Sequence, residues 1–460
     1  MTISIEKDKR KSLSVICVAS FLVPFMGSSL NLAMPQISEA FDMKAVTLTW
    51  MVTAYMIATA IFQVPFARLA DMIGRKKIFL WGILGFSILT ALCGFVTTGW
   101  MLISLRFLSG VASAMIAGTQ IAIITAIFPP EQRGKALGIN TAVVYAALAA
   151  GPFVGGFLTH YLSWRSIFFL PAALGILTLA LSKIWLKGEW MEASGEKFDG
   201  FGAVLYAIGL AGLIYGFSSL PSLVGIICLA VGVFSLTGFV LHERRNSSPL
   251  FNVRLFSGNR VFALSSVAAL INYAATSATA FMLSLYLQYV RGFNPDYAGL
   301  ILISQACVQS VFSLVAGEMS TRIAPSKLST LGMSIIVVGL CGLTFLSATT
   351  PIWYLIVLLM MLGMGFGIFS SPNTNVIMGS VEKKYYTQAS AVTGTMRMTG
   401  QAVSMGIAGM AISFYVGNHA LEPALYPDFL RSLKLTFIIF TVLCLIGVYA
   451  SSVRSKKRTG

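Results

Sequence analysis

Fourteen long apolar segments make up most of this chain. Each contains about 20 or more mostly apolar residues, which is the length that an α-helix needs to cross a bilayer. In lipid a helix satisfies its own backbone polar groups, so such segments fold as a packed helical bundle. We therefore expect an all-α polytopic membrane protein, with helices at 13–34, 46–70, 78–97, 101–127, 136–160, 166–186, 201–219, 222–241, 260–289, 296–319, 329–348, 352–372, 388–416 and 430–451.

The distribution of charge predicts the orientation of the chain. Only 10% of residues are charged, against about 25% in soluble domains. The net charge of +16 suggests a nucleic-acid partner, but the positions of the charges argue against one. Of 32 Lys and Arg, 25 fall in the two tails and the even-numbered loops, and two fall inside helices. Five lie in the remaining loops: Lys44, Arg165, Arg291, Arg431 and Lys434.

This bias predicts a multi-pass protein of the cell membrane with both termini in the cytoplasm. We expect the basic tails to lie against anionic lipid head groups of the bilayer.

Two polar linkers divide the helices into groups. Residues 187–200 and 242–260 bracket one pair of helices and leave six helices before it and six after it. Six plus six suggests two repeated halves, as in transporters that rock around a central site. We expect an N-terminal six-helix bundle at 1–187, an inserted pair with its linkers at 188–259, and a C-terminal bundle with a basic tail at 260–460. Because one chain holds both halves, we expect a monomer.

The loop after the second helix carries a motif. Residues 67–77 read Ala-Arg-Leu-Ala-Asp-Met-Ile-Gly-Arg-Lys-Lys, and 317–327 align with them without a gap, although Thr321 replaces the Asp and Ala324 the Gly. This stretch resembles the loop signature of the major facilitator superfamily, although Ala67 replaces its first Gly and Met72 a usual Arg. The resemblance implies a conformational latch that favours the outward-facing state, formed by Asp71, Gly74, Arg75 and Lys76. The alternative is an ordinary basic loop.

Helix four contains Arg106, early in its sequence. An arginine inside the membrane is costly and marks a functional candidate. The stretch 106–110 resembles the fourth-helix motif of the superfamily, with Ser109 in place of Gln, which implies a role in proton coupling or substrate charge. The alternative is an arginine that extends to the membrane surface.

Helix five contains a run of small residues around a proline. Residues 147–156 resemble the signature of facilitator-superfamily exporters, with Ala147 at its first Gly position. The exporter residues are Gly151, Pro152, Gly155 and Gly156. Small residues let helices approach closely, so generic packing is the alternative. Other stretches, among them residues 198–202 before helix seven, resemble the corresponding stretches of the fourteen-helix drug:proton antiporter branch. The inserted pair of helices is the feature that defines this branch.

One position departs from that branch. Many members carry an acidic residue in helix one where this chain has Met26, and no Asp or Glu falls in the middle of any predicted helix. Exchange of a cation for protons usually needs a buried carboxylate. Either the coupling proton sits on Asp71 or Glu318, or the cargo is neutral or anionic and Arg106 and Arg397 matter more.

Polar side chains within helices are candidates for a substrate cavity. The resemblance implies that helices one, four, nine and twelve surround the central cavity, which favours Asn31, Gln120 and Asn272. Hydrogen bonds between helices are the alternative for each residue. The candidates are Met26, Asn31, Gln63, Gln120, Asn272, Gln305 and Gln309.

We predict neither an enzyme nor a metal or cofactor site, because no nucleotide-binding, metal-binding or catalytic motif stands out. The function we expect is a secondary active transporter that exports drugs or other lipophilic small molecules by alternating access, driven by the proton gradient. Its partners are then a small-molecule substrate and protons. The alternative is uptake or export of a specific neutral or anionic metabolite without proton/cation antiport.

Overall fold

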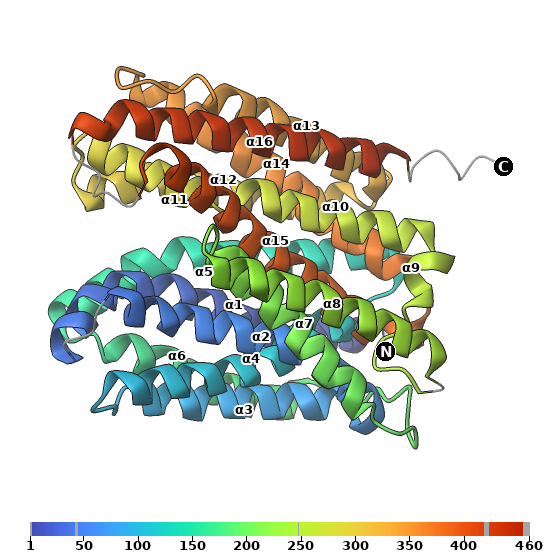
Figure 1. The fold of residues 1–460 in the computed structure, drawn as a ribbon. Coiled ribbons are helices and arrows are strands. Elements are labelled where there is room, and N and C mark those ends of the chain that lie inside the picture. The colour runs from blue at the N-terminus through green and yellow to red at the C-terminus, as the bar shows by residue number, and fades with distance from the viewer. Residues whose placement is uncertain (1, 42–44, 247, 418–422, 454–460) are drawn as a thin grey trace. The chain divides into compact units, whose positions relative to one another are not determined.

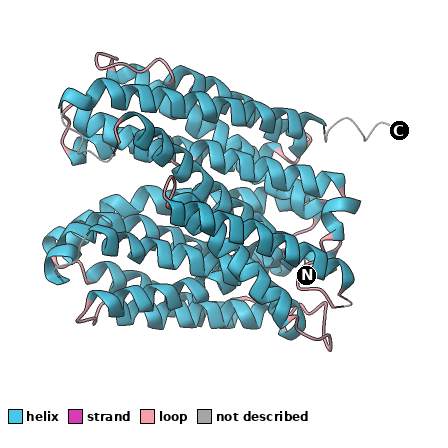
Figure 2. Ribbon diagram, viewed as in Figure 1, coloured by secondary structure: helices cyan, strands magenta, loops and turns pink. Residues whose placement is uncertain are grey.

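The computed structural model describes residues 2–41, 45–246, 248–417 and 423–453. Within these ranges every regular element is helical and no strand occurs, which confirms the predicted all-α class (Figure 2). Thirteen helices of the described part are long and apolar enough to cross a membrane. The remaining predicted segment is also a long helix of 30 residues, but polar side chains such as Arg397 and Gln401 lie along it.

Every predicted segment is helical in the structure (Figure 1), but the first helix extends beyond the predicted 13–34 at both ends, and a short helix at Arg254–Gly258 lies where a linker was predicted. In chain order the helices are α1 Thr2–Phe41, α2 Ala45–Ile73, α3 Arg75–Cys93, α4 Gly99–Ile127, α5 Pro130–Tyr161, α6 Ser166–Trp185, α7 Gly200–Ser218, α8 Leu223–Arg245, α9 Arg254–Gly258, α10 Arg260–Thr276, α11 Thr279–Leu285, α12 Pro295–Met319, α13 Pro325–Leu343, α14 Ile352–Gly379, α15 Tyr386–Tyr415 and α16 Tyr426–Val453.

The ninth predicted segment is the one that is interrupted. It consists of α10, α11 and a π-helical turn at Tyr286–Val290. At the break between α10 and α11, the Ala278 amide donates to the Ser404 hydroxyl at 2.9 Å instead of closing a helical bond. A side chain from α15 therefore stabilises this discontinuity.

The chain divides into two packed units. The first contains residues 1–207, 238–253 and 381–395, and the second contains residues 208–237, 254–380 and 396–460. Both the inserted pair α7–α8 and α15 thus contribute residues to each unit.

Within the first unit, α1 packs against α5 and α6, and α4 packs against α2 and α3. Its buried core includes Leu22 of α1, Phe86 of α3 and Ile116 of α4. In lipid, helices associate through close packing rather than through hydrophobic burial. Small residues supply this packing: a Cβ on Gly82 of α3 would lie 2.8 Å from the Met115 Cβ of α4.

Within the second unit, α14 packs against α12 and α13, while α16 packs against α10 and α13. Glycines again set the closest approaches. A Cβ on Gly332 of α13 would lie 2.6 Å from the Gly365 carbonyl oxygen of α14. In the inserted pair, a Cβ on Gly212 would lie 2.9 Å from the Gly232 Cα.

Candidate functional site

The predicted latch is organised around the turn between α2 and α3. Gly74 has φ +119, which a residue with a side chain rarely adopts. The turn brings Arg75 back over Asp71, whose Oδ1 lies 3.0 Å from both Nε and Nη2 of the guanidinium. Both side chains are only 1% exposed. This is a buried pair with charge-assisted hydrogen bonds.

The start of α15 completes the same cluster. The Thr387 hydroxyl donates to Asp71 Oδ1 at 2.6 Å, and Arg75 Nη2 donates to the Lys383 carbonyl at 3.1 Å. These residues belong to the same packed unit as Asp71. Asp71 of α2 therefore lies against the first turn of α15, where the amide end of a helix favours a negative charge. Sequence reasoning missed Thr387 and Lys383, because they lie more than 300 positions away.

The linker before α7 packs on the other side of the turn. The amides of Glu192 and Ala193 both donate to the Asp71 carbonyl at 3.0 Å, and the Arg75 amide donates to the Trp190 carbonyl at 3.0 Å. The Lys76 amide donates to the Glu189 carboxylate at 2.8 Å. Lys76 thus contributes through its backbone.

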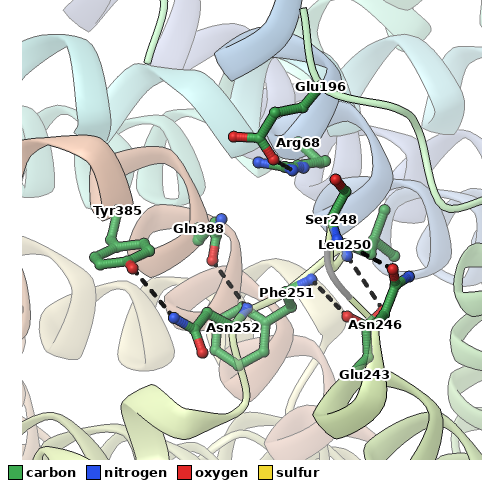
Figure 3. Close-up of polar contacts among 10 residues, drawn as sticks. All are labelled: Arg68, Glu196, Glu243, Asn246, Ser248, Leu250, Phe251, Asn252, Tyr385 and Gln388. Carbon is green, nitrogen blue, oxygen red and sulfur yellow. Dashed lines mark hydrogen bonds and ion pairs between the residues drawn. The ribbon is translucent and has the colours of Figure 1, made fainter. Parts of the chain in front are cut away.

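Further along the same linker, Glu196 forms an ion pair with Arg68, which fastens the linker to α2 (Figure 3). The sequence did not predict these contacts of the linker, because the only feature of the linker that could be recognised in the sequence was its polarity.

Arg106 is buried between α2 and α4. Its guanidinium lies 4.2 Å from the centre of the Tyr55 ring, and its Nε donates to the Met51 carbonyl at 3.3 Å. The Tyr55 hydroxyl bonds the Ser113 hydroxyl at 2.7 Å. Among the described residues, no carboxylate forms an ion pair with Arg106. The charge is thus held by an aromatic face and a backbone carbonyl.

The exporter glycines lie where α5 meets α1. A Cβ on Gly155 would lie 2.8 Å from the Ser29 Cβ, and one on Gly151 would overlap the Ser28 hydroxyl. Gly156 is partly exposed, and Pro152 lies within α5, but its side chain is outside the described part. The two glycines therefore allow a helix contact that no larger residue fits.

The first unit contains four of the cavity candidates. Met26 is fully buried in the core, and Gln120 accepts a hydrogen bond from Ser20 of α1 at 2.6 Å. Gln63 is 1% exposed and packs against Gly394 of α15, with Oε1 unpaired among the described atoms. Asn31 lies in α1, but its side chain is outside the described part.

The second unit contains the remaining candidates. Asn272 of α10 is fully buried, and neither polar atom of its amide has a partner among the described residues. Gln309 is buried and Gln305 partly buried, and both lie on α12 where its backbone contacts α14. Arg397 is partly buried in α15, whereas Glu318 is exposed at the end of α12.

Comparison with known proteins identifies the family. The family model described as Major Facilitator Superfamily matches residues 16–405 and, again, 265–459. The chain belongs to the major facilitator superfamily. The predicted membership of the superfamily is thereby confirmed, and so is the transporter fold.

Its relatives include a riboflavin transporter and proteins named for drug resistance. The riboflavin transporter RibZ of Clostridioides difficile is 28% identical over 394 residues, covering 85% of each chain. The multidrug resistance protein Stp of Mycobacterium tuberculosis is 27% identical over 86% of this chain and 74% of its own. The tetracenomycin C resistance and export protein of Streptomyces glaucescens is 24% identical over 88% of this chain and 76% of its own.

Solved structures agree with this fold. The human organic anion transporter MFSD10 has a TM-score of 0.67 at 13% identity, covering 96% of this chain and 99% of that one. The proton:xylose symporter XylE has a TM-score of 0.71 at 11% identity, covering 96% and 95%. At these identities the likeness concerns the fold alone.

Proposed function

We propose that this major facilitator exports drugs or other lipophilic small molecules by alternating access, driven by the proton gradient. The observation that carries the proposal is the cluster at Asp71, which joins α2, α3 and the start of α15 through two hydrogen bonds to one carboxylate oxygen. Such a cluster is a contact that can close and open. Relatives named for drug resistance support the choice of cargo.

The latch works through the breaking of two contacts. For α15 to move away from the turn, Thr387 must release Asp71 and Arg75 must release the Lys383 carbonyl. Hydrogen bonds that involve a charged group are worth about 1.5–3 kcal/mol each. A latch of this strength holds one conformation while remaining reversible. In our proposal the basic loops face the cytoplasm, so the closed latch belongs to the outward-facing state.

Of the two acids proposed for the coupling proton, the environment favours Asp71. It is buried, and its Oδ2 has no partner among the described atoms, so a proton can reside there. Glu318 is exposed at the end of α12. Protonation of Asp71 would weaken its bonds to Arg75 and Thr387, which couples the proton to the latch.

A second candidate function is transport of a specific neutral or anionic metabolite. The observation that favours it is Arg106, a buried cation for which no described carboxylate forms an ion pair, together with a buried Met26 in α1. A buried cation attracts an anionic or polar group more readily than a cationic drug. The relative named as a riboflavin transporter is compatible with this alternative.

Accumulation of fluorescent cationic, neutral and anionic compounds in pump-deficient cells separates the two functions. We expect expression of the protein to lower accumulation of lipophilic compounds, and a protonophore to abolish the effect. The Arg106→Ala variant reports whether the charge of the cargo matters. If no compound of the panel is exported while riboflavin or another metabolite is moved, the drug-export proposal is wrong.

A further inference from the structure

A short segment after the inserted pair is fastened to the end of α8. We call residues 248–253 the strap. The amides of Leu250 and Phe251 donate to the two oxygens of Glu243 at 3.3 and 3.4 Å (Figure 3). Leu250 is fully buried and Phe251 is 4% exposed, so the strap is packed as well as hydrogen-bonded. Glu243 is 3% exposed.

A second carboxylate faces Glu243 from the start of α7. Asp199 accepts from the Gly202 amide at 2.9 Å and from the His242 imidazole at 3.0 Å, and it is also bonded by the Asn246 side chain. Burial tends to raise the pKa of Asp199, but these donors outweigh burial and the pKa lies below its ordinary value. Asp199 is therefore the ionised member of the pair at neutral pH.

The two carboxyl groups lie next to each other. Both side chains pack against Gly202. A Cβ added to this glycine would meet an oxygen of Asp199, and it would lie 2.6 Å from an oxygen of Glu243. Within the described part of the chain, neither Lys nor Arg forms an ion pair with either carboxyl group, and His242 is bonded to Asp199. Two carboxylates in contact cannot both ionise without strong repulsion. The packed arrangement therefore requires a shared proton.

The strap amides do not reverse this conclusion. An ionised Glu243 would accept more strongly from Leu250 and Phe251, but distances of 3.3 and 3.4 Å indicate weak bonds. Burial disfavours the ionised form of Glu243, and the neighbouring charge of Asp199 acts in the same direction, so that together they outweigh the strap amides. Loss of the proton should push Glu243 away from Asp199 and disturb the strap.

The far end of the strap reaches the latch. The Asn252 amide donates to Gln388 Oε1 at 3.1 Å, and the Asn252 side-chain amide donates to the Tyr385 hydroxyl at 3.2 Å (Figure 3). Tyr385 and Gln388 flank Thr387, which donates to Asp71. The strap thus links the end of α8 to the start of α15 within one packed unit.

We propose that Asp199 and Glu243 form a proton-binding site that docks the strap and thereby steadies the start of α15 beside Asp71. With the proton bound, Glu243 donates to Asp199 and its oxygens still accept from the strap. When the proton leaves at alkaline pH, the strap loosens and so does the latch contact. The consequence for transport rests on the proposed function, whereas the docking of the strap does not.

Hydrogen–deuterium exchange of the full-length protein in detergent or nanodiscs tests the site directly. The readout is the protection of residues 248–253 relative to that of Gly94 and Phe95, whose amides donate to backbone carbonyls at the end of α3 that is away from the latch. The ratio cancels the intrinsic pH dependence of exchange. We expect it to fall about tenfold between about pH 6 and about pH 9 in the unmodified protein.

Two substitutions of Glu243 should act in opposite ways. Glu243→Gln resembles the protonated form, because it can donate to Asp199 and accept from the strap, so its ratio should stay high at every pH. Glu243→Ala removes the anchor, so its ratio should be low at every pH. The matched control is Glu382→Gln, an exposed glutamate near α15, which should follow the unmodified protein.

The proposal is overturned if the ratio is flat with pH in the unmodified protein, or if Glu243→Gln still shows the alkaline loss. The exchange measurement needs no substrate, so it tests this site independently of the proposed function. If the protection of the strap depends on pH but the protein exports none of the tested drugs, the proposed function is wrong and the proton-binding site still stands.

Discussion

At the scale of single residues, one carboxylate oxygen carries the latch. Asp71 Oδ1 binds a guanidinium from α3 and a hydroxyl from α15 at once, and both partners approach to 3.0 Å or less. Because the site is buried, water cannot replace either partner when it is removed. Conservative substitutions here should therefore have clear effects.

Asp71→Asn keeps the shape of the side chain and removes its charge. A hydrogen bond to a charged acceptor is worth about 1 kcal/mol more than one to a neutral acceptor, so we expect the start of α15 to open about fivefold more often. Exchange of residues 386–390 measures this opening. Thr387→Ala should act in the same direction, and Thr387→Ser should not. Unchanged exchange in both Asp71→Asn and Thr387→Ala would show that this contact does not hold α15.

Gly74→Ala should destabilise the turn. Its φ of +119 disfavours any side chain, and the new Cβ would lie 2.6–2.9 Å from the Glu189 carboxylate. We expect a cost of about 1–2 kcal/mol, seen as a lower unfolding temperature. Gly27→Ala is the matched control, because nothing lies within 4 Å of its added Cβ in α1. That substitution should be neutral or slightly stabilising, and equal losses from both would contradict the role of the turn.

At the scale of helices, the sequence predicted positions well and contacts poorly. The length of the apolar segments predicted all the long helices, because the thickness of the membrane determines how many apolar residues a spanning helix needs. The break between α10 and α11 was not predicted. It depends on the Ser404 hydroxyl, which lies 126 positions from Ala278.

The loop motif and Arg106 could be found from local patterns, since charged residues at helix ends or inside helices are conspicuous. Their partners could not, because Thr387 and Tyr55 are chosen by packing between distant segments. Glu243 was missed for a related reason. In sequence it belongs to a polar linker, whereas in the structure the strap covers it.

The contact between α1 and α5 gives a prediction at this scale. Gly155→Val should force the two helices apart, because even a Cβ would lie 2.8–3.0 Å from Ser29. We expect a loss of about 1–3 kcal/mol, measured as the thermal stability of the purified protein. Gly299→Ala on α12 provides the control, since nothing lies within 4 Å of its Cβ. A Gly155→Val protein as stable as the control would mean that the close approach is not required.

At the scale of the whole molecule, the inserted pair is more than an addition to two six-helix bundles. Both of its linkers contact the turn or the start of α15: residues 189–193 bond to the turn, and Asn252 bonds to the start of α15. These contacts explain why the packed units do not follow the order of the chain.

The most direct test of the central claim is transport by the purified protein in liposomes with an imposed pH gradient. The account predicts that a lipophilic drug accumulates only when the gradient is present and that proton movement accompanies it. Asp71→Asn should lose the dependence on the gradient while still binding the drug. Transport that is independent of the gradient in the unmodified protein, or that stays fully coupled in Asp71→Asn, would contradict the account.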